Sequence, residues 1–405
     1  MSEVLAYGFK LSENFGGPSV LHGFRAALEK VAPGTGIVYY DPAPIDPVAV
    51  SDMDFPVREF PYTKRIRAFL KDWARQKLLR RLPKDAGRRR FWEDYRAADA
   101  VVNIYAICFC GNWGVRTVAR KHASRKLCLR RMLEQFLPNL VARLDGKVSV
   151  KSTSSYGELC TDAVRTIARW SARWCFTRMV AREEESRRQM RELAGARRDM
   201  PVAPDLANLL PYAVRASDRP VVGIVTSFQI ERKWAGSAEG YLDCMRSLVR
   251  HVRDDFGCEV LLIPNQINGP DGRGDAEVAD DILAGVPDRT GLSVFDMAGS
   301  GACALKSAIA ACAAVVSPRY HSCVAALSSG VPLLTLGWHY KYGELMALYG
   351  QSSRALPTER CTVRELRDQF DRLWADREKI RTVLAAKGAE VSGAVLNSVK
   401  WMLEG

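Results

Sequence analysis

An arginine and a histidine stand two residues apart in the C-terminal third of the chain, as Arg319 and His321. The apolar run 313–316 precedes them, and small residues, a glycine and a second apolar run, 331–336, follow. This order predicts a strand, a polar turn, a helix and another strand, in about the length of a parallel βαβ unit. At such turns, backbone N–H groups and the helix start favour negative charge. The segment therefore predicts a site for a small anion, with Lys341 as a further cation beyond the second strand.

These side chains suit anion binding and proton transfer. The planar guanidinium of Arg319 can pair two oxygens of a phosphate or carboxylate at once. His321 is the candidate general acid and base, because an imidazole titrates near neutral pH. Structural alternatives stay open: Arg319 could pair with a nearby acid, and His321 could only cap the next helix. Lys341 stands among aromatic residues that could stack on a sugar ring or fill a seam between domains.

Three more polar side chains follow predicted strands elsewhere in the chain. Asn14 lies in a glycine-containing turn between a predicted strand at 4–9 and a predicted helix at 20–30. Arg182 ends a predicted strand and precedes three glutamates, so it is either an anion ligand or a member of a charge network. Arg232 is a candidate from its position after a strand alone.

Strand and helix patterns alternate along the whole chain. Further strands are predicted at 37–40, 100–110, 148–151, 221–227, 260–264 and 292–296, and further helices at 156–178, 238–254 and 276–284. This alternation predicts two doubly wound parallel α/β domains. We expect an N-terminal domain at 1–205, a linker at 206–220, a C-terminal domain at 221–370, and a helical region at 371–405 that is long enough to reach back onto the first domain.

Composition agrees with a cytoplasmic protein of two domains. With 405 residues, 47% of them hydrophobic, the chain can bury two cores. No apolar run approaches the roughly 18 residues that cross a bilayer, and the N-terminus lacks the pattern of a secretion signal. The eleven cysteines are scattered through apolar segments and read as reduced core residues. Cys108 and Cys110 form the nearest metal-like pair, but no second pair completes a site, so no metal is expected.

Most of the net charge of +13 lies in residues 64–90, where twelve Lys and Arg side chains face only Asp72 and Asp85. The same segment carries an apolar, partly helical stripe that consists of Ile66, Phe69, Leu70, Trp73, Leu78 and Leu79. It is either a solvated face or a contact with an anionic membrane or a phosphate-bearing lipid carrier. The second reading would make the protein peripheral at the inner face of the membrane. No nucleic acid is expected, because no binding module accompanies the basic run.

Several short motifs follow one another along most of the chain. They are Asn14-Phe15-Gly16; Val180-Ala181-Arg182-Glu183 with Ser186; Ala203-Pro204-Asp205; the acidic helix start at 275–282; and Arg319-Tyr320-His321-Ser322, followed by Gly330-Val331-Pro332 and Lys341. Taken in this order, they resemble the polysaccharide pyruvyltransferase family. Three features depart from the family pattern. Gly17-Pro18 replaces an acidic residue, Tyr320 stands where leucine is common, and the basic segment 64–90 is unusual.

The resemblance implies a GT-B-like architecture of two Rossmann-like doubly wound domains that face a cleft. It also implies transfer of a pyruvyl group from phosphoenolpyruvate to a saccharide as a ketal, in cell-surface or exopolysaccharide biosynthesis. His321 would then transfer the proton, Arg319 and Arg182 would hold phosphate and carboxylate, and Lys341 and Asn14 would be further contacts. Phosphoenolpyruvate is the donor substrate, and no cofactor or metal is implied. The acceptor could be lipid-linked, nucleotide-linked or polymeric.

Two other classes of protein remain as alternatives. A GT-B glycosyltransferase that uses a nucleotide sugar would share the fold, and it would need a carboxylate for the ribose, for which Glu344 is the nearest acid. A non-catalytic protein of the same fold would be expected to lack Arg319 or His321, and both are present.

Overall fold

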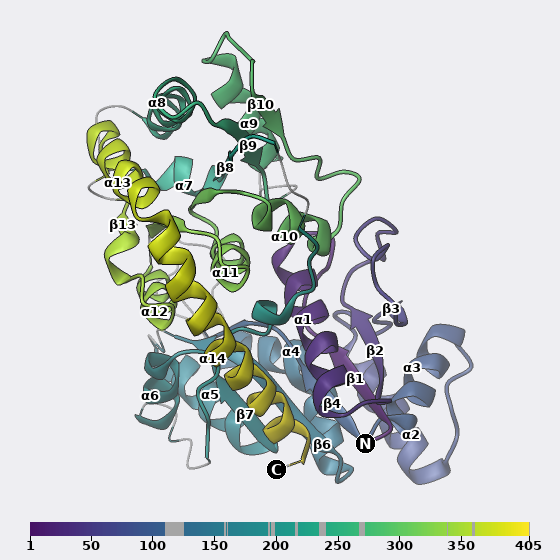
Figure 1. Cartoon of the computed structure of the whole chain (residues 1–405). Helices are drawn as coiled ribbons and strands as arrows, with labels where there is room; N and C mark the ends of the chain where they lie inside the picture. Colours follow the sequence, from purple (N-terminus) through teal and green to yellow (C-terminus); the bar gives the residue numbers. More distant parts are fainter. Residues whose placement is uncertain are drawn as a thin grey trace. The chain divides into compact units, whose positions relative to one another are not determined.

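The computed structural model describes residues 1–109, 125–157, 159, 161–192, 195, 199–214, 218–234, 240–266, 272–337, 339–358 and 361–404. The chain divides into two units. Unit 1 consists of Met1–Leu11, Phe24–Leu206 and Ala394–Gly405, and unit 2 consists of Ser12–Gly23 and Ala207–Gly393. Figure 1 gives the elements of both units along the chain.

Unit 1 is built on a parallel sheet. Its strands are β1 (Glu3–Tyr7), β2 (Gly36–Asp41), β3 (Val57–Glu59), β4 (Ala100–Asn103), β5 (Ile107–Cys108), β6 (Val148–Tyr156) and β7 (Arg178–Ala181). They follow the order β3-β2-β1-β4-β6-β5, with β7 also paired to β6. The central strands are buried on both faces, as a parallel sheet covered by helices requires.

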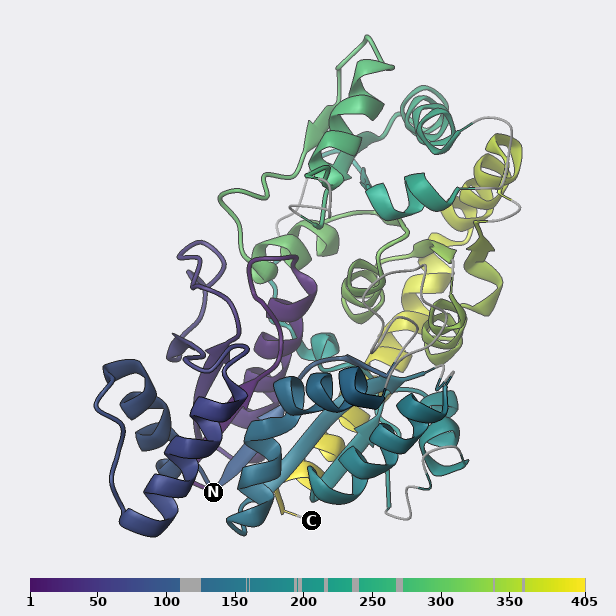
Figure 2. The same cartoon turned by 180° about the vertical axis from the view of Figure 1, so that it is seen from behind.

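The helices of unit 1 lie on both sides of this sheet (Figures 1 and 2). They are α2 (Ile66–Leu79), α3 (Ala86–Ala97), α4 (Arg125–Leu144), α5 (Asp162–Trp174) and α6 (Glu184–Glu192), together with parts of α1 (Gly16–Val31) and α14 (Arg377–Glu404). Side-chain caps fix two of the starts. The Asp85 carboxylate accepts from Arg88 N at 2.9 Å before α3, and the Thr161 hydroxyl accepts from Val164 N at 3.2 Å before α5.

Unit 2 carries a second parallel sheet. Its strands are β8 (Val221–Val225), β9 (Glu259–Ile263), β10 (Leu292–Val294), β11 (Ala314–Ser317), β12 (Leu333–Gly337) and β13 (Ala355–Pro357). The order β10-β9-β8-β11-β12-β13 is that of a doubly wound sheet, and the chain reverses its direction of winding between β8 and β11. Ligands of such sheets bind where the strands end at this reversal.

Seven α-helices belong wholly to unit 2 among the described residues. They are α7 (Phe228–Lys233), α8 (Tyr241–Asp254), α9 (Asp275–Ala284), α10 (Ala302–Ala310), α11 (Tyr320–Ser328), α12 (Tyr340–Leu348) and α13 (Val363–Ala375). The short helix η2 (Ser352–Arg354) precedes β13, and η1 (Leu206–Leu209) spans the boundary between the units. Within unit 2, α8 packs against α13, and α10 packs against α11.

Two predicted elements of unit 1 are wrong in their bounds. The strand expected at 100–110 is split into β4 and β5, because the Asn103 side chain accepts a hydrogen bond from Tyr105 N at 3.2 Å and turns the chain. The helix expected at 156–178 begins only after the cap at Thr161, because β6 continues to Tyr156 beside β5 and β7. Both errors come from pairing between distant strands, which local patterns do not report.

The apolar stripe expected in residues 64–90 is only partly buried. Phe69 has no exposed surface, whereas Leu78 and Leu79 are 79% and 61% exposed. The solvent-facing part of α2 is therefore apolar as well as basic.

The predicted linker is not an extended connection throughout. Its first residues form η1, and the Tyr349 hydroxyl donates to Asn208 Oδ1 at 2.6 Å. The buried Lys306 ammonium donates to the carbonyl oxygens of Asn208 and Leu210 at 3.2 and 2.9 Å. Residues 207–210 thus pack as part of unit 2. In the described part of the chain, no helix combines the length and apolar character that a membrane crossing needs.

Candidate functional site

Two neighbouring strands of unit 2 end at the point where the sheet reverses its winding. After β8, the Ser227 hydroxyl accepts from Ile230 N at 3.4 Å and begins α7. After β11, the chain passes through Pro318 to Arg319, which is the N-cap residue of α11. The Ser317 hydroxyl accepts from Arg319 N at 3.1 Å and fixes this turn. The sequence therefore brings Arg319 to the ligand-binding edge of the sheet.

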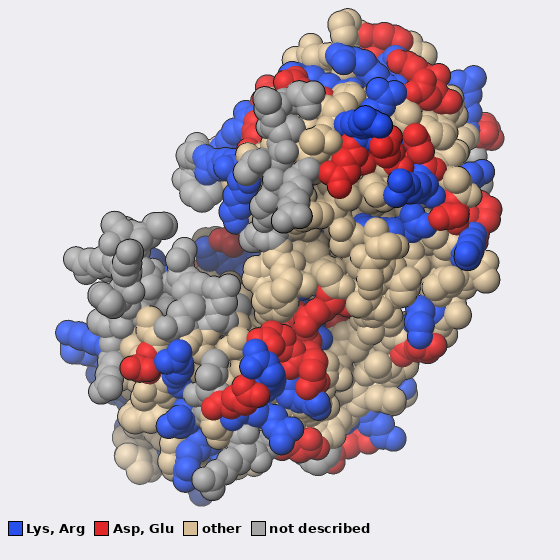
Figure 3. Space-filling view, turned by 90° about the vertical axis from the view of Figure 1, so that its left-hand side faces the viewer, with Lys and Arg blue, Asp and Glu red and all other residues tan. Residues whose placement is uncertain are grey.

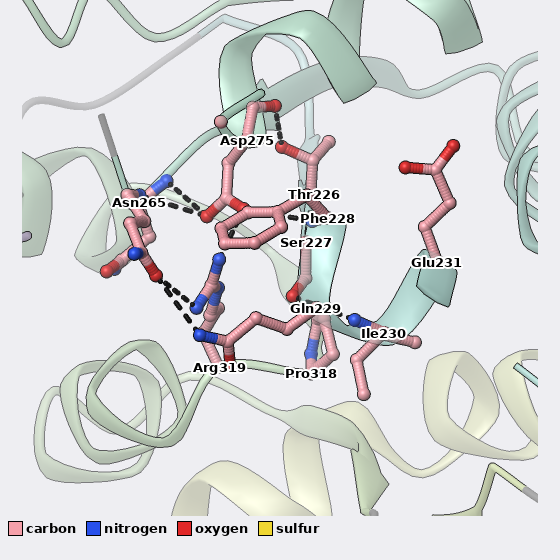
Figure 4. Close-up of polar contacts among 12 residues, drawn as sticks. Thr226, Ser227, Phe228, Gln229, Ile230, Glu231, Asn265, Asp275, Pro318 and Arg319 are labelled. Carbon is pink, nitrogen blue, oxygen red and sulfur yellow. Dashed lines mark hydrogen bonds and ion pairs between the residues drawn. The ribbon is translucent and has the colours of Figure 1, made fainter. Parts of the chain in front are cut away.

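A buried carboxylate, Asp275 at the start of α9, joins these turns (Figure 4). Its Oδ1 accepts from Phe228 N at 3.0 Å, and its Oδ2 accepts from the backbone N of Asn265 and Gln266 at 3.2 and 2.9 Å. The Thr226 hydroxyl donates to the Asp275 carbonyl oxygen at 2.8 Å. With no exposed surface and three backbone donors, Asp275 is a fixed anion around which the site is arranged.

Arg319 is held on this carboxylate. Its Nη2 donates to Asp275 Oδ1 (Figure 4), and its Nη1 donates to Gln266 Oε1 at 3.0 Å. The guanidinium carbon lies 5.4 Å from the centre of the Phe228 ring. Within the described parts of the chain, the buried Nε has no hydrogen-bond partner, and 13% of the side chain is exposed. Arg319 is therefore fixed in direction while one N–H of its fork is not used by these residues.

His321 lies on the first turn of α11, two residues after Arg319. No acidic residue stands in that turn, so the positive end of the helix is not offset there. A Cβ atom built on Gly16 would come within 2.5 Å of His321 Nδ1. The turn that contains Gly16 is thus packed directly against the imidazole, and a larger residue at that position would displace the ring.

The predicted Asn14 turn belongs to unit 2, although the sequence placed it in the first domain. Asn14 forms an isolated antiparallel bridge with Gln266, and Phe15 N donates to Asn265 O at 3.4 Å. The Asn14 side chain accepts from Gly16 N at 2.8 Å. These contacts bring the turn to the end of β9, beside the residues that hold Arg319.

Lys341 lies on the first turn of α12. Its Nζ is 5.3 Å from the ring centre of Tyr320 and 5.6 Å from that of Tyr342. The Tyr342 hydroxyl donates to Pro318 O at 2.7 Å, which ties α12 to the turn before α11. The structure therefore places Lys341 beside the Arg319–His321 turn. Trp338 of the predicted aromatic cluster lies outside the described residues.

Arg232 and Glu344, the two remaining candidates of this half of the chain, lie on α7 and α12. The Arg232 side chain is exposed, and its guanidinium carbon lies 5.8 Å from the centre of the Phe228 ring, the same ring that Arg319 covers. Arg232 thus stands near the site by its contact with Phe228.

Arg182 lies in unit 1 and has a different environment. Its Nε donates to Glu183 at 2.7 Å, its Nη1 donates to Asp205 at 2.8 Å, and its Nη2 donates to the Ser155 hydroxyl. The side chain is 2% exposed. Carboxylates accept from two of the three guanidinium nitrogens, and the Ser155 hydroxyl accepts from the third. Because the side chain is almost fully buried, this charge network lies inside unit 1 and not on its surface.

Burial and hydrogen bonds act in opposite directions on Glu183. Burial opposes its ionisation, but the charge of Arg182 and hydrogen bonds from Ser155, Arg182 and Ser186 outweigh that effect and lower its pKa. Nearby, burial lowers the pKa of Lys151 to about 8. The side chain of Lys151 has no exposed surface, and its ammonium donates to Tyr105 O and to Ser154 Oγ. This end of the first sheet is a packed polar core.

The role of Asp275 was not anticipated from the sequence, although the acidic start of its helix was noted. The available signal was an aspartate that follows a glycine at the start of a predicted helix, where a carboxylate can accept from backbone N–H groups of adjacent turns. Gln266 and Asn265 gave no signal, because their roles depend on β9 lying beside β8.

Comparison with known proteins gives one family. A sequence profile described as polysaccharide pyruvyl transferase matches residues 50–340. No protein of curated function matches the chain significantly.

Solved structures share the architecture at low identity. A putative UDP-N-acetylglucosamine 2-epimerase from Listeria monocytogenes has a TM-score of 0.60 at 10% identity, over 98% of this chain and 94% of that one. The UDP-GlcNAc 2-epimerase from Methanocaldococcus jannaschii gives 0.56 at 10% identity, over 92% and 93%. A glycosyltransferase from Rickettsia africae gives 0.51 at 10% identity, over 99% and 96%. At these identities the likeness shows the fold alone, which is GT-B-like with two Rossmann-like units, as the sequence predicted.

Proposed function

Because the chain belongs to the polysaccharide pyruvyl transferase family and is a transferase, we propose that it moves the pyruvyl group of phosphoenolpyruvate onto a saccharide as a ketal. One observation carries the proposal. On a helix start without acidic residues, Arg319 is fixed by Asp275 and Gln266, and His321 follows it within the same turn. This arrangement suits a donor that carries two anionic groups.

Arg319 and Lys341 are the proposed donor ligands. Phosphoenolpyruvate carries a phosphate and a carboxylate, so its site needs at least two placed cations. The exposed part of the Arg319 side chain, together with the first turn of α11, can bind one anionic group. Lys341, beside the same turn, can accept the other. Asp275 prevents the guanidinium from turning away when no substrate is bound.

The reaction requires one proton at carbon. Two sugar hydroxyls add to C2 of phosphoenolpyruvate, the bond between C2 and the phosphate oxygen breaks, and C3 gains a proton to become a methyl group. Of the two hydroxyl protons, one balances the proton gained at C3 and the other leaves with phosphate. His321 is proposed to carry the proton between hydroxyl and C3, because an imidazole can both accept and donate near neutral pH.

The Asn14 turn is proposed to position this histidine. Gly16 lies so close to His321 Nδ1 that a Cβ would meet the ring, and Asn14 bridges to Gln266, which also holds Arg319. The turn therefore connects the proton-transfer group with the anion-binding group. Arg232 remains a proposed substrate contact, whereas the proposed role of Arg182 is to stabilise unit 1. Arg182 is saturated by its neighbours, and Arg232 reaches the site through Phe228.

The acceptor is proposed to be a lipid-linked, nucleotide-linked or polymeric saccharide of cell-surface or exopolysaccharide biosynthesis. A cytoplasmic location with peripheral contact at the inner face of the membrane would bring donor and acceptor together. The nine cysteines in the described part of the chain are all free thiols, which suits a reducing compartment. No cofactor or metal has a part in the proposed reaction.

A product assay tests the proposal. The protein is incubated with phosphoenolpyruvate and a panel of lipid-linked, nucleotide-linked and polymeric saccharides, and mass spectrometry follows the pyruvyl ketal while released phosphate is measured. We expect a ketal and an equal amount of phosphate with one acceptor class. His321→Ala should lower turnover by about 10²–10⁴ while donor affinity changes little. Transfer of a sugar from a nucleotide sugar, with no ketal, would favour the glycosyltransferase alternative.

A further inference from the structure

The outer face of α2 in unit 1 combines exposed leucines with basic side chains. This outer face consists of Arg67, Leu70, Lys71, Arg75 and Leu78, all of which are exposed. They share one side of the helix because residues three and four apart are neighbours on a helix surface. Leu70 and Leu78 are 38% and 79% exposed, and the adjoining Leu79 is 61% exposed.

The inner face of α2 is firmly packed, so the leucines outside are not needed to hold the helix. The Phe69 ring lies 5.0 Å from the Tyr62 ring and 5.0 Å from the Trp92 ring, between centroids. Trp73 Nε1 donates to Asp145 Oδ2 at 3.1 Å, and Lys77 Nζ donates to Asp145 Oδ1 at 2.7 Å. The outer face is therefore presented on a helix that is already fixed.

The basic side chains of the outer face lack acidic partners. Arg67, Lys71 and Arg75 form no ion pair with any residue of the described chain. The one acid of α2, Asp72, is buried and accepts hydrogen bonds from Tyr62 and Arg88 on the inner side. Uncompensated positive charge thus coincides with exposed apolar surface.

Other charged surfaces of the molecule are different. On the face drawn in Figure 3, acidic and basic side chains lie next to one another. On α6, Arg187 pairs with Glu184 at 2.7 Å and Arg188 pairs with Glu185 at 2.6 Å. The outer face of α2 is therefore not an ordinary solvated charge pattern, in which opposite signs offset each other.

We propose that the outer face of α2 docks the protein on an anionic lipid bilayer. Basic side chains would contact the headgroups, and Leu78 and Leu79 at the end of the helix would enter the interface beneath them. Arg80 and Arg81 follow at once, so the leucines are flanked by cations on both sides. This combination fits a lipid surface, which offers both negative charge and an apolar layer.

Two other occupants fit less well. A nucleic acid would use the arginines and lysines but would leave the leucines in water, because its backbone offers only charge. An acidic protein would pair with the arginines and lysines, but it would need an apolar recess for Leu78 and Leu79 as well. Both occupants are kept as outcomes of the test.

Vesicle co-sedimentation tests the proposal with the full chain. The vesicles are phosphatidylcholine alone, or phosphatidylcholine and phosphatidylglycerol in equal parts. We expect binding only to the anionic vesicles, with weakening at high salt. Each basic residue at the surface adds about fivefold to partitioning, so R67Q/K71Q/R75Q should lower it by roughly a hundredfold. L78S/L79S should also lower partitioning. The binding that remains depends on charge, so it should be lost at a lower salt concentration than the binding of the wild type.

Matched controls separate the face from net charge. R364Q/R372Q/K379Q removes three exposed cations from α13 and α14 and should leave partitioning unchanged. L144S removes an exposed leucine of α4, outside the outer face of α2, and should do the same. Equal loss in both triple variants, equal binding to neutral vesicles, no effect of L78S/L79S, or tighter binding to duplex RNA or to polyglutamate than to anionic vesicles would each overturn the proposal.

This inference rests on the proposed function in one respect only: if the acceptor is lipid-linked, the protein would meet it at the docked membrane surface. Vesicle binding is measured without donor or acceptor, and titration with phosphoenolpyruvate reports on unit 2. Loss of one with retention of the other therefore identifies which proposal has failed.

Discussion

Two arginines follow parallel strands in the two units, and their surroundings differ. Arg182 follows β7 in unit 1 and donates from all three nitrogens, two of them to carboxylates. Arg319 follows β11 in unit 2 and donates from two nitrogens, one of them to a carboxylate and one to an amide. Arg182 is 2% exposed, and Arg319 is 13% exposed. The same residue type, placed after a parallel strand in each unit, is thus saturated in one unit and only fixed in the other.

The difference teaches how to separate structural from ligand-binding arginines. Two buried carboxylates more than neutralise the positive charge of the guanidinium between them. Such a guanidinium therefore attracts a further anion only weakly. A guanidinium fixed by one carboxylate and one amide keeps its direction and part of its donor capacity. Arg319 therefore suits the binding of phosphate or carboxylate, whereas Arg182 suits the stability of unit 1.

The largest effect is expected from Arg182→Met. Removing the cation leaves Glu183 and Asp205 buried without their partner, which should cost about 3–5 kcal/mol of stability. Hydrogen exchange followed by mass spectrometry should place the loss in β6 and β7, with unit 2 unchanged. If the variant is as stable as the wild type but no longer binds phosphoenolpyruvate, Arg182 is a substrate ligand and the contrast fails.

Arg319→Ala should lower activity strongly and stability only slightly, the reverse of what is expected for Arg182→Met. Asp275 keeps three backbone donors, so stability should fall by only about 1–3 kcal/mol, the cost of one unmet partner. Pyruvyl transfer should fall by about 10²–10³, as when a placed electrostatic donor is removed. Product formation and thermal unfolding are measured on the same preparation. Retained transfer in a folded variant would remove Arg319 from the site.

Gly16→Ala should sharpen the assignment of His321. The new Cβ would meet Nδ1, so the imidazole must move, and transfer should fall by about tenfold to a hundredfold with little loss of stability. Gly388→Ala is the control, because a Cβ at this position of α14 meets nothing within 4 Å. Its activity should equal that of the wild type. Equal activity in Gly16→Ala would mean that the turn does not position the histidine.

The smallest effect concerns acid stability. The pKa of Glu183 lies below its ordinary value of 4.5 in the folded chain, so the unfolded chain binds more protons as the pH falls through this range. The stabilisation is present above pH 4.5 and is lost as the pH falls through the lowered pKa. Glu183→Gln should remove this part of the pH dependence in urea titrations at several pH values.

Glu184→Gln is the matched control for this titration. Glu184 pairs with Arg187 on the surface and is 64% exposed, so the wild-type pH dependence should persist in this variant. If Glu183→Gln and the wild type lose stability in parallel on acidification, the buried network is not what makes unit 1 sensitive to acid.

The sequence predicted the parts of the fold that depend on local patterns of apolar and polar residues. Strand and helix patterns alternate clearly enough to indicate two doubly wound sheets, and Arg319 and His321 lie on the turn expected for them. The break between β4 and β5 was not predicted, because it depends on a hydrogen bond from Tyr105 N to the side chain of Asn103.

Long-range contacts account for what the sequence did not predict about the site. Residues 12–23 belong to unit 2, although they directly follow β1 of the first sheet. Asp275 reaches Phe228 across 47 positions and Arg319 across 44, and neither spacing carries a local signal. Such contacts are fixed by the order of strands in the sheet, which a single sequence does not display.

The central claim is that the Arg319–His321 turn of unit 2 binds phosphoenolpyruvate, and calorimetric titration tests it most directly. Wild type, Arg319→Ala, His321→Ala and the conservative Arg182→Lys are titrated with phosphoenolpyruvate, after thermal unfolding has shown each to be folded. We predict saturable binding by the wild type, His321→Ala and Arg182→Lys. Binding by Arg319→Ala should be weaker by about 2–5 kcal/mol, the cost of removing one partner of a charged pair. Unchanged affinity in Arg319→Ala, with binding lost in folded Arg182→Lys, would contradict the account and move the donor site to unit 1.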